Sequence, residues 1–124
     1  RQPLGWAACC GRYVDHWLTL PAPDAESLMR SRYSAFVRQQ ADYLLATWAP
    51  AQRPATLALD HGAKWLGLEV RSHRNTDELH AEVEFVARWR EAGRAVRLHE
   101  RSRFERRADA QGTWRWWYVD GDQF

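Results

Sequence analysis

The residues most able to do chemistry in this sequence lie in the segment VRLHERSRFERR, residues 96–107. Val96, Leu98 and Phe104 alternate at the spacing of a β-strand, and Glu100 and Ser102 occupy the same alternating positions. The pattern therefore predicts a strand that directs a carboxylate and a hydroxyl toward the protein core. A buried, unpaired carboxylate is costly, so we expect a second charged group to meet Glu100 there.

A basic side chain reaches the core from a second predicted element. Asp24 is a favourable N-cap, and the chain from there to about Gln40 has the period of a helix. One charged residue, Arg32, falls within its apolar stripe, which consists of Ala25, Leu28, Met29, Tyr33, Ala35, Phe36 and Val37. We therefore expect Arg32 and Glu100 to form a buried ion pair, with Ser102 and Tyr33 completing the hydrogen bonds.

Aromatic residues are abundant, because the 124 residues include eight Trp and four Tyr. Such a composition favours either a thick aromatic core or a cavity lined by rings. A charged pair at the floor of an aromatic cavity is a common arrangement for orienting a small ligand, so a ligand-binding role is compatible with the ion pair. The candidate ligand-binding residues are Arg32, Tyr33, Trp48, Trp65, Glu100 and Ser102.

The elements that position these residues are predicted to be helices followed by strands. A second short helix, residues 42–48, must end before Pro50, and a third possible helix lies between Pro54 and Gly62. Residues 1–23 read as irregular.

After Gly62 the hydrophobic period changes to two, which predicts four strands, at 64–72, 80–90, 96–106 and 114–119. Leu66, Leu68 and Val70 are expected to face one way, toward the core. Asp120 and Asp122 are expected to be turn residues after the last strand. This order predicts an α+β fold, with the helices packed on one face of an antiparallel sheet.

Charge and hydropathy exclude several classes of protein. The net charge of +2 is too small for a dedicated nucleic-acid binder, and acids alternate with the arginines on the outer face of the predicted sheet. No apolar run approaches the roughly 18 residues of a membrane span, and the N-terminal segment lacks the apolar stretch of a signal peptide. We expect a cytoplasmic protein that does not bind membranes or nucleic acid; a homodimer is possible.

Recognised catalytic and cofactor motifs are absent from the sequence. There is no P-loop, dinucleotide fingerprint, HExxH or nucleophile elbow. Cys9 and Cys10 are adjacent and supply at most two of the four ligands that a tetrahedral zinc site needs. We therefore expect no metal and no cofactor, and we assign no catalytic residue.

Five ordered motifs together resemble the YchJ family of bacterial proteins: LMRSRYSAFV (28–37), WLGLEV (65–70), EFVAR (84–88), HERSRF (99–104) and WYVDG (117–121). The resemblance implies that residues 24–124 form a nuclear transport factor 2-like (NTF2-like) domain. That domain is an α+β cone, in which N-terminal helices pack on a strongly bent antiparallel sheet and leave a pocket. Family members typically begin with a zinc-binding SEC-C motif, and Cys9 and Cys10 match only its second half. Residues 1–23 are therefore expected to contain a remnant of that motif.

Three functions follow as hypotheses. The leading one is a noncatalytic module whose pocket binds a small ligand or a protein partner. The resemblance to the NTF2-like fold leaves an isomerase or dehydratase as an alternative, with Glu100 as base and Tyr33 as donor, provided that Arg32 does not lock Glu100. An adaptor to the translocation or translation machinery would rest on the SEC-C resemblance alone.

Overall fold

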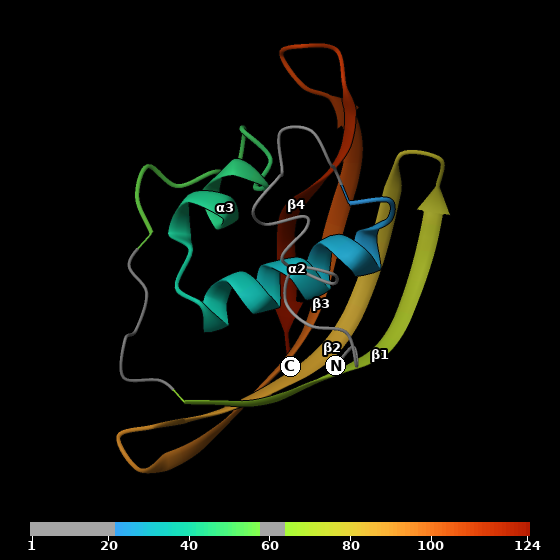
Figure 1. Cartoon of the computed structure of the whole chain (residues 1–124). Helices are drawn as coiled ribbons and strands as arrows, with labels where there is room; N and C mark the ends of the chain where they lie inside the picture. The colour runs from blue at the N-terminus through green and yellow to red at the C-terminus, as the bar shows by residue number, and fades with distance from the viewer. Residues whose placement is uncertain (1–21, 58–63) are drawn as a thin grey trace.

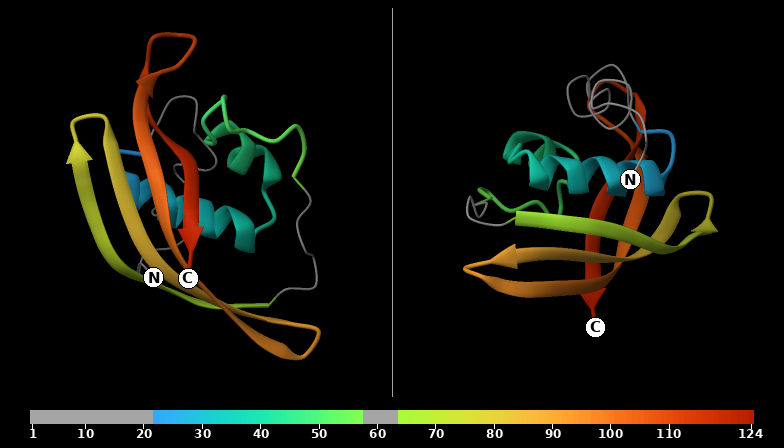
Figure 2. Two further views of the ribbon diagram at one scale, coloured as in Figure 1. Left: turned by 180° about the vertical axis from the view of Figure 1, so that it is seen from behind. Right: turned by 60° about the horizontal axis from the view of Figure 1, so that its bottom comes forward.

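A computed structural model describes residues 22–57 and 64–124 of the chain. Two helices, α2 (Ala25–Val37) and α3 (Ala41–Ala46), precede four strands, β1 (Lys64–Asp77), β2 (His80–Glu91), β3 (Arg94–Ala108) and β4 (Trp114–Gln123). The strands form one antiparallel sheet in the order β1-β2-β3-β4. The sheet curls around both helices, which lie on its concave side (Figures 1 and 2). The predicted α+β fold, with helices on one face of a bent sheet, is confirmed.

Helix α2 begins where the sequence predicts but ends earlier. The Asp24 carboxylate accepts a hydrogen bond of 2.7 Å from the backbone N–H of Ser27, which is the action of an N-cap. The helix ends at Val37 because Gln39 adopts a left-handed conformation (φ 59°), and the N–H groups of Gln39 and Gln40 bond back to the last turn. The predicted extension to Gln40 is therefore too long.

Strand β1 contains an irregularity that the alternating pattern did not reveal. It continues past its predicted end because β2 pairs with it along the whole hairpin. The pairing register shifts between Trp65 and Gly67, so that Leu66 points outward and is 51% exposed. Leu68 and Val70 do pack against the core. Grouping Leu66 with them is wrong, because one extra residue reverses every side chain on one side of it.

Strand β4 includes the DGD sequence that was expected to form a turn. The register skips one residue between Tyr118 and Asp120, which is a β-bulge. As a result Tyr118 and Gly121 face the helices, whereas Asp120 and Asp122 face outward. There Arg103 donates to both carboxylates, at 2.6 and 2.7 Å, and its hydrogen bonds hold the pKa of Asp122 below its usual range. These contacts keep the segment in the sheet, so the turn assignment is wrong.

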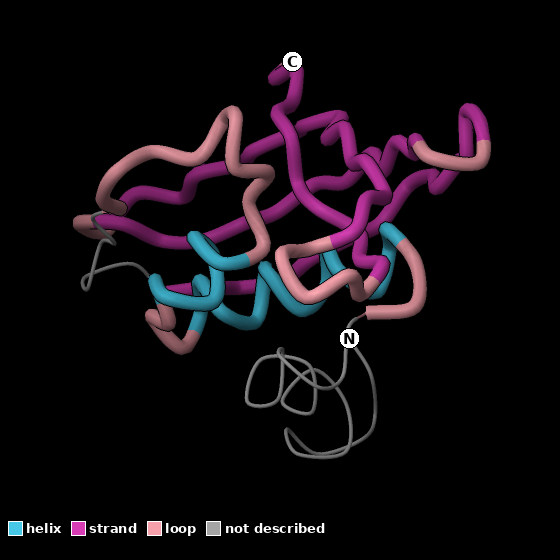
Figure 3. Tube along the Cα trace, turned by 90° about the horizontal axis from the view of Figure 1, so that it is seen from above, coloured by secondary structure: helices cyan, strands magenta, loops and turns pink. Residues whose placement is uncertain are grey.

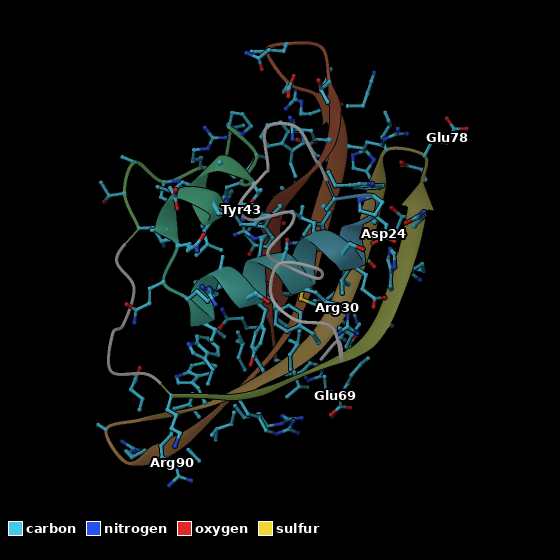
Figure 4. The ribbon with its side chains drawn as sticks, in the orientation of Figure 1. Asp24, Arg30, Tyr43, Glu69, Glu78 and Arg90 are labelled. Carbon is cyan, nitrogen blue, oxygen red and sulfur yellow. The ribbon has the colours of Figure 1, made fainter. Side chains whose placement is uncertain are left out.

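Helix α2 lies against the sheet, as the view from above shows (Figure 3), and the core lies between them. Its central cluster consists of Ala25, Leu28, Met29, Ala81, Val83 and Phe104. A smaller cluster of Ala35, Tyr43 and Leu44 fixes α3 against α2, and Tyr43 lies between the two helices (Figure 4). The Tyr43 hydroxyl is hydrogen bonded to Ser31 Oγ at 2.7 Å, so α3 holds a defined position against α2.

Two earlier predictions reach beyond the described residues. Residues 54–57 are irregular, so the third helix does not form there, and the rest of it lies outside the described part of the chain. Cys9 and Cys10 lie outside it as well. Among the described residues, no helix is long and apolar enough to cross a membrane, and no cluster of three or more potential metal ligands occurs.

Candidate functional site

A cavity of about 380 Å³ opens between the helices and the concave face of the sheet. All six residues that the sequence nominated line it: Arg32, Tyr33, Trp48, Trp65, Glu100 and Ser102. Arg32 and Tyr33 come from α2, Trp65 from β1, and Glu100 and Ser102 from β3. Trp48 follows α3. Two further polar residues of the lining, Glu91 and Gln123, are exposed and do not belong to the buried floor.

Packed aromatic rings form one wall of the cavity. The Tyr33 ring meets Trp65 edge-on, with ring centres 5.5 Å apart, and Trp65 lies 5.0 Å from its cross-strand partner Trp89. The irregularity beside Trp65 is what places this ring on the concave face. Rings that are packed in this way are held in one orientation, so the wall is largely preformed.

Arg32 is buried at the side of the cavity next to α3, and only 5% of it is exposed. Its Nη1 donates hydrogen bonds of 2.7 Å to the carbonyl of Leu44 and to Thr47 Oγ1. Its guanidinium also lies over the rings of Tyr118, 4.5 Å from the centre, and Trp48, 5.4 Å from the centre. Burial lowers the pKa of Arg32 to about 10, opposed by the nearby Tyr118, Tyr43 and Glu100, so it stays charged at neutral pH.

Glu100 lies on the floor of the cavity and is 8% exposed. Its Oε2 accepts a hydrogen bond of 2.5 Å from Ser102 Oγ and a longer one, of 3.3 Å, from the Tyr118 hydroxyl. The structure describes both Glu100 and Arg32, and no ion pair joins them. The predicted ion pair is therefore wrong: Arg32 donates to residues at the carbonyl end of α3, and Tyr118 contacts Arg32 with its ring and Glu100 with its hydroxyl.

Each of the two charged groups keeps unused hydrogen-bonding capacity. Within the described residues, Nε and Nη2 of Arg32 and Oε1 of Glu100 have no partner. Every fully buried side-chain nitrogen or oxygen of the described residues has a hydrogen-bond partner. Because these three atoms have none, they are not fully buried. Because both residues line the cavity, the free donors and the free acceptor are available to a molecule inside it.

Tyr118 is the site residue that sequence reasoning missed. Burial, and then the charge of Glu100, raise the pKa of its hydroxyl, so Tyr118 remains a neutral donor. Its ring packs against Trp48 and Phe104, at 5.1 and 5.8 Å between ring centres. The signal was present in the sequence, since Tyr118 shares the alternation of the last strand, but the contact of its hydroxyl with Glu100 depends on tertiary packing.

Gly121 is expected to be required for the position of Glu100. A Cβ at this position would collide with the Glu100 carboxylate, which is held by Ser102. Gly121→Ala should displace that carboxylate and lower the free energy of unfolding by about 1 to 3 kcal/mol in denaturant melts. Gly67→Ala is the matched control, since its Cβ would meet nothing within 4 Å, and should be nearly neutral. Equal effects of the two changes would show that Glu100 moves freely.

Comparisons with known proteins place this architecture among bacterial relatives. Residues 24–121 match the family model described as YchJ, middle NTF2-like domain. A UPF0225 protein of Polaromonas naphthalenivorans is 67% identical over 123 residues, which is 99% of this chain and 85% of the relative. A UPF0225 protein of Bordetella pertussis is 55% identical over 122 residues, which is 98% of this chain and 88% of the relative.

One solved structure is similar along nearly the whole chain. It is a SEC-C motif-containing protein from Psychrobacter arcticus, with a TM-score of 0.82 and 33% identity. The match covers 97% of this chain and 73% of that protein. The curled sheet with helices on its concave side is therefore shared with that protein.

Proposed function

Since this chain belongs to the YchJ family, whose middle domain is NTF2-like, we propose that the cavity of this domain binds a small ligand without catalysing a reaction on it. One observation carries the proposal. Arg32 and Glu100 are both buried beside the same cavity, and neither neutralises the other by direct contact. Holding two such charges in the core costs several kcal/mol, and a ligand that contacts both would offset that cost.

The size and lining of the cavity favour a small molecule over a protein surface. A volume of about 380 Å³ lies within the range of about 300 to 1,000 Å³ that is typical of small-molecule sites. Aromatic rings would cover the apolar body of the ligand, while the two charged groups would fix its orientation. A folded protein partner could insert no more than one side chain into such a space.

A second candidate function is catalysis with Glu100 as a general base. The observation that favours it is the separation of Glu100 from Arg32, which leaves Oε1 open to the cavity. The phenol that reaches Glu100 is Tyr118 and not Tyr33. We place this candidate second because the described residues of the cavity lining include no histidine, cysteine or lysine that could act as nucleophile or proton shuttle.

Filling the cavity should abolish ligand binding. Ala87 lines the cavity and is 2% exposed, so Ala87→Phe would place a ring in the space. The probes are four molecules with one phenyl ring: L-phenylalanine, 3-phenylpropionate, 2-phenylethylammonium and 3-phenylpropanol. In ¹H–¹⁵N NMR titrations, we expect at least one probe to shift the signals of cavity residues saturably in the wild type and none to do so in Ala87→Phe.

Ala95→Phe is the control, since Ala95 is exposed on β3 and does not line the cavity. It should bind like the wild type. If Ala87→Phe does not fold, Leu98→Trp fills the same space from the neighbouring strand. Binding that is unchanged in the filled variants, or no binding of any probe at millimolar concentration, would overturn the proposed function.

A further inference from the structure

The hydrogen-bonding atoms of Arg32 and Glu100 that have no partner indicate the chemical class of the ligand. Arg32 has hydrogen bonds only to a carbonyl and a hydroxyl, which are neutral, and no carboxylate forms an ion pair with it among the described residues. Its Nε and Nη2 have no partner among the described residues and are not fully buried, and Arg32 lines the cavity. A planar guanidinium with two free nitrogens is suited to a carboxylate, which can accept two parallel hydrogen bonds.

Glu100, in contrast, requires a hydrogen-bond donor. Ser102 and Tyr118 both donate to Oε2, which leaves Oε1 as an acceptor that has no partner among the described residues and is not fully buried. A carboxylate oxygen in an apolar surrounding is best satisfied by a cationic donor such as an ammonium group. A ligand with only a negative charge would satisfy Arg32 but would be repelled by Glu100, and a ligand with only a positive charge would have the converse problem.

The spacing of the two charges restricts the ligand further. The Tyr118 ring centre lies 4.5 Å from Arg32 Cζ, and the hydroxyl of the same ring lies 3.3 Å from Glu100 Oε2. The two groups therefore contact the same phenol, Arg32 at its ring face and Glu100 at its hydroxyl. A small ligand that carries a carboxylate and an ammonium close together could then hydrogen bond to both.

Most of the rest of the cavity lining is apolar or aromatic, apart from the exposed Glu91 and Gln123. Beyond the charged floor it is bounded by Phe36, Trp65, Phe85 and Trp89, so the body of the ligand must be apolar and is well matched by an aromatic ring. On these grounds, and resting on the proposed function, we infer that the ligand is a small zwitterion with an apolar or aromatic body, of which an aromatic α-amino acid is the simplest example. Its carboxylate would bind Arg32, and its ammonium group would bind Glu100.

The same four phenyl probes test this inference by isothermal titration calorimetry. L-Phenylalanine should bind about tenfold or more tightly than 3-phenylpropionate, 2-phenylethylammonium and 3-phenylpropanol, since only the amino acid satisfies both charges. Glu100→Gln should remove the advantage of the amino acid over 3-phenylpropionate. Arg32→Met should remove its advantage over 2-phenylethylammonium.

The outcomes separate the inference from the proposed function. If 3-phenylpropanol binds in the cavity as tightly as L-phenylalanine, the cavity is a ligand site but the zwitterion inference is wrong. If one singly charged probe binds most tightly, the inference is wrong in the same way. If no probe binds in the cavity, the proposed function fails as well. Should Glu100→Gln fold poorly, the ranking of the four probes on the wild-type protein still decides the question.

Discussion

Replacing Arg32 with methionine is expected to weaken the binding of a carboxylate ligand by about 30-fold or more, while it changes the free energy of unfolding by only about 1 kcal/mol. The effect on stability is small because opposing contributions nearly cancel. Removing the guanidinium relieves the cost of burying a charge that has no direct counterion. It also removes two hydrogen bonds from a charged donor, each worth about 1.5 to 3 kcal/mol, and two ring contacts.

Arg30→Met is the matched control for that experiment. Arg30 lies on the same helix and pairs with Glu26 at 2.9 Å, and it does not line the cavity. Denaturant melts and ligand titrations of both variants should show unchanged binding for Arg30→Met. A loss of stability of about 3 kcal/mol or more in Arg32→Met would contradict this account, since it would mean that the guanidinium is kept for the fold.

The second large effect is expected at Tyr118. Tyr118→Ala should lower the free energy of unfolding by about 3 kcal/mol or more, because the ring packs against Phe104, Trp48 and Arg32 together. Tyr118→Phe keeps the ring and removes only the hydrogen bond to Glu100, so it should cost about 1 kcal/mol or less. Chemical denaturation of the three proteins at neutral pH measures both effects.

Tyr118→Phe also has a predicted signature in alkali. The pKa of Tyr118 is raised in the folded protein above its ordinary value of about 10, so the unfolded chain releases the tyrosine proton first. The contribution of Tyr118 is therefore fully present below pH 10 and is lost as the pH rises above it. The wild type should therefore lose stability relative to Tyr118→Phe as the pH rises from about 10 toward the raised pKa of Tyr118. Parallel curves over this range would contradict the burial of the Tyr118 hydroxyl beside Glu100.

Local rules in the sequence predicted the parts of the fold that depend on short-range order. The side-chain oxygen of Asp24 marks the start of α2, and the helical period places Arg32 on the buried face. The alternation of β3 directs Glu100 and Ser102 inward, and all six nominated residues do line one cavity. These features depend on residues that are close together in the sequence, which is the range over which hydrophobic periodicity is informative.

Two single-residue shifts explain most of the errors in the strands. Periodicity assumes strict alternation, so it cannot show that the register moves at Leu66 or between Tyr118 and Asp120. The second shift has the larger consequence, since it turns Asp120 outward to Arg103 and places Gly121 against Glu100.

The partner of Arg32 could not be predicted for a different reason. The sequence indicates that Arg32 and Glu100 both face inward, but the acceptors of Arg32 come from a third element, α3. Because Tyr43 fixes α3 against α2, the carbonyl of Leu44 and the hydroxyl of Thr47 lie within hydrogen-bonding distance of the guanidinium. The inward direction of a side chain therefore predicts that it lines the site, but it does not predict which residue the side chain bonds to.

The most direct test of the account is a crystal structure of the protein in complex with L-phenylalanine. The account predicts that the ligand carboxylate lies within hydrogen-bonding distance of Arg32 Nε or Nη2, that its ammonium group contacts Glu100 Oε1, and that its ring lies among Trp65, Trp89 and Phe85. An empty cavity with Arg32 and Glu100 bonded directly to each other would contradict the central claim that the two charges are held apart for a ligand.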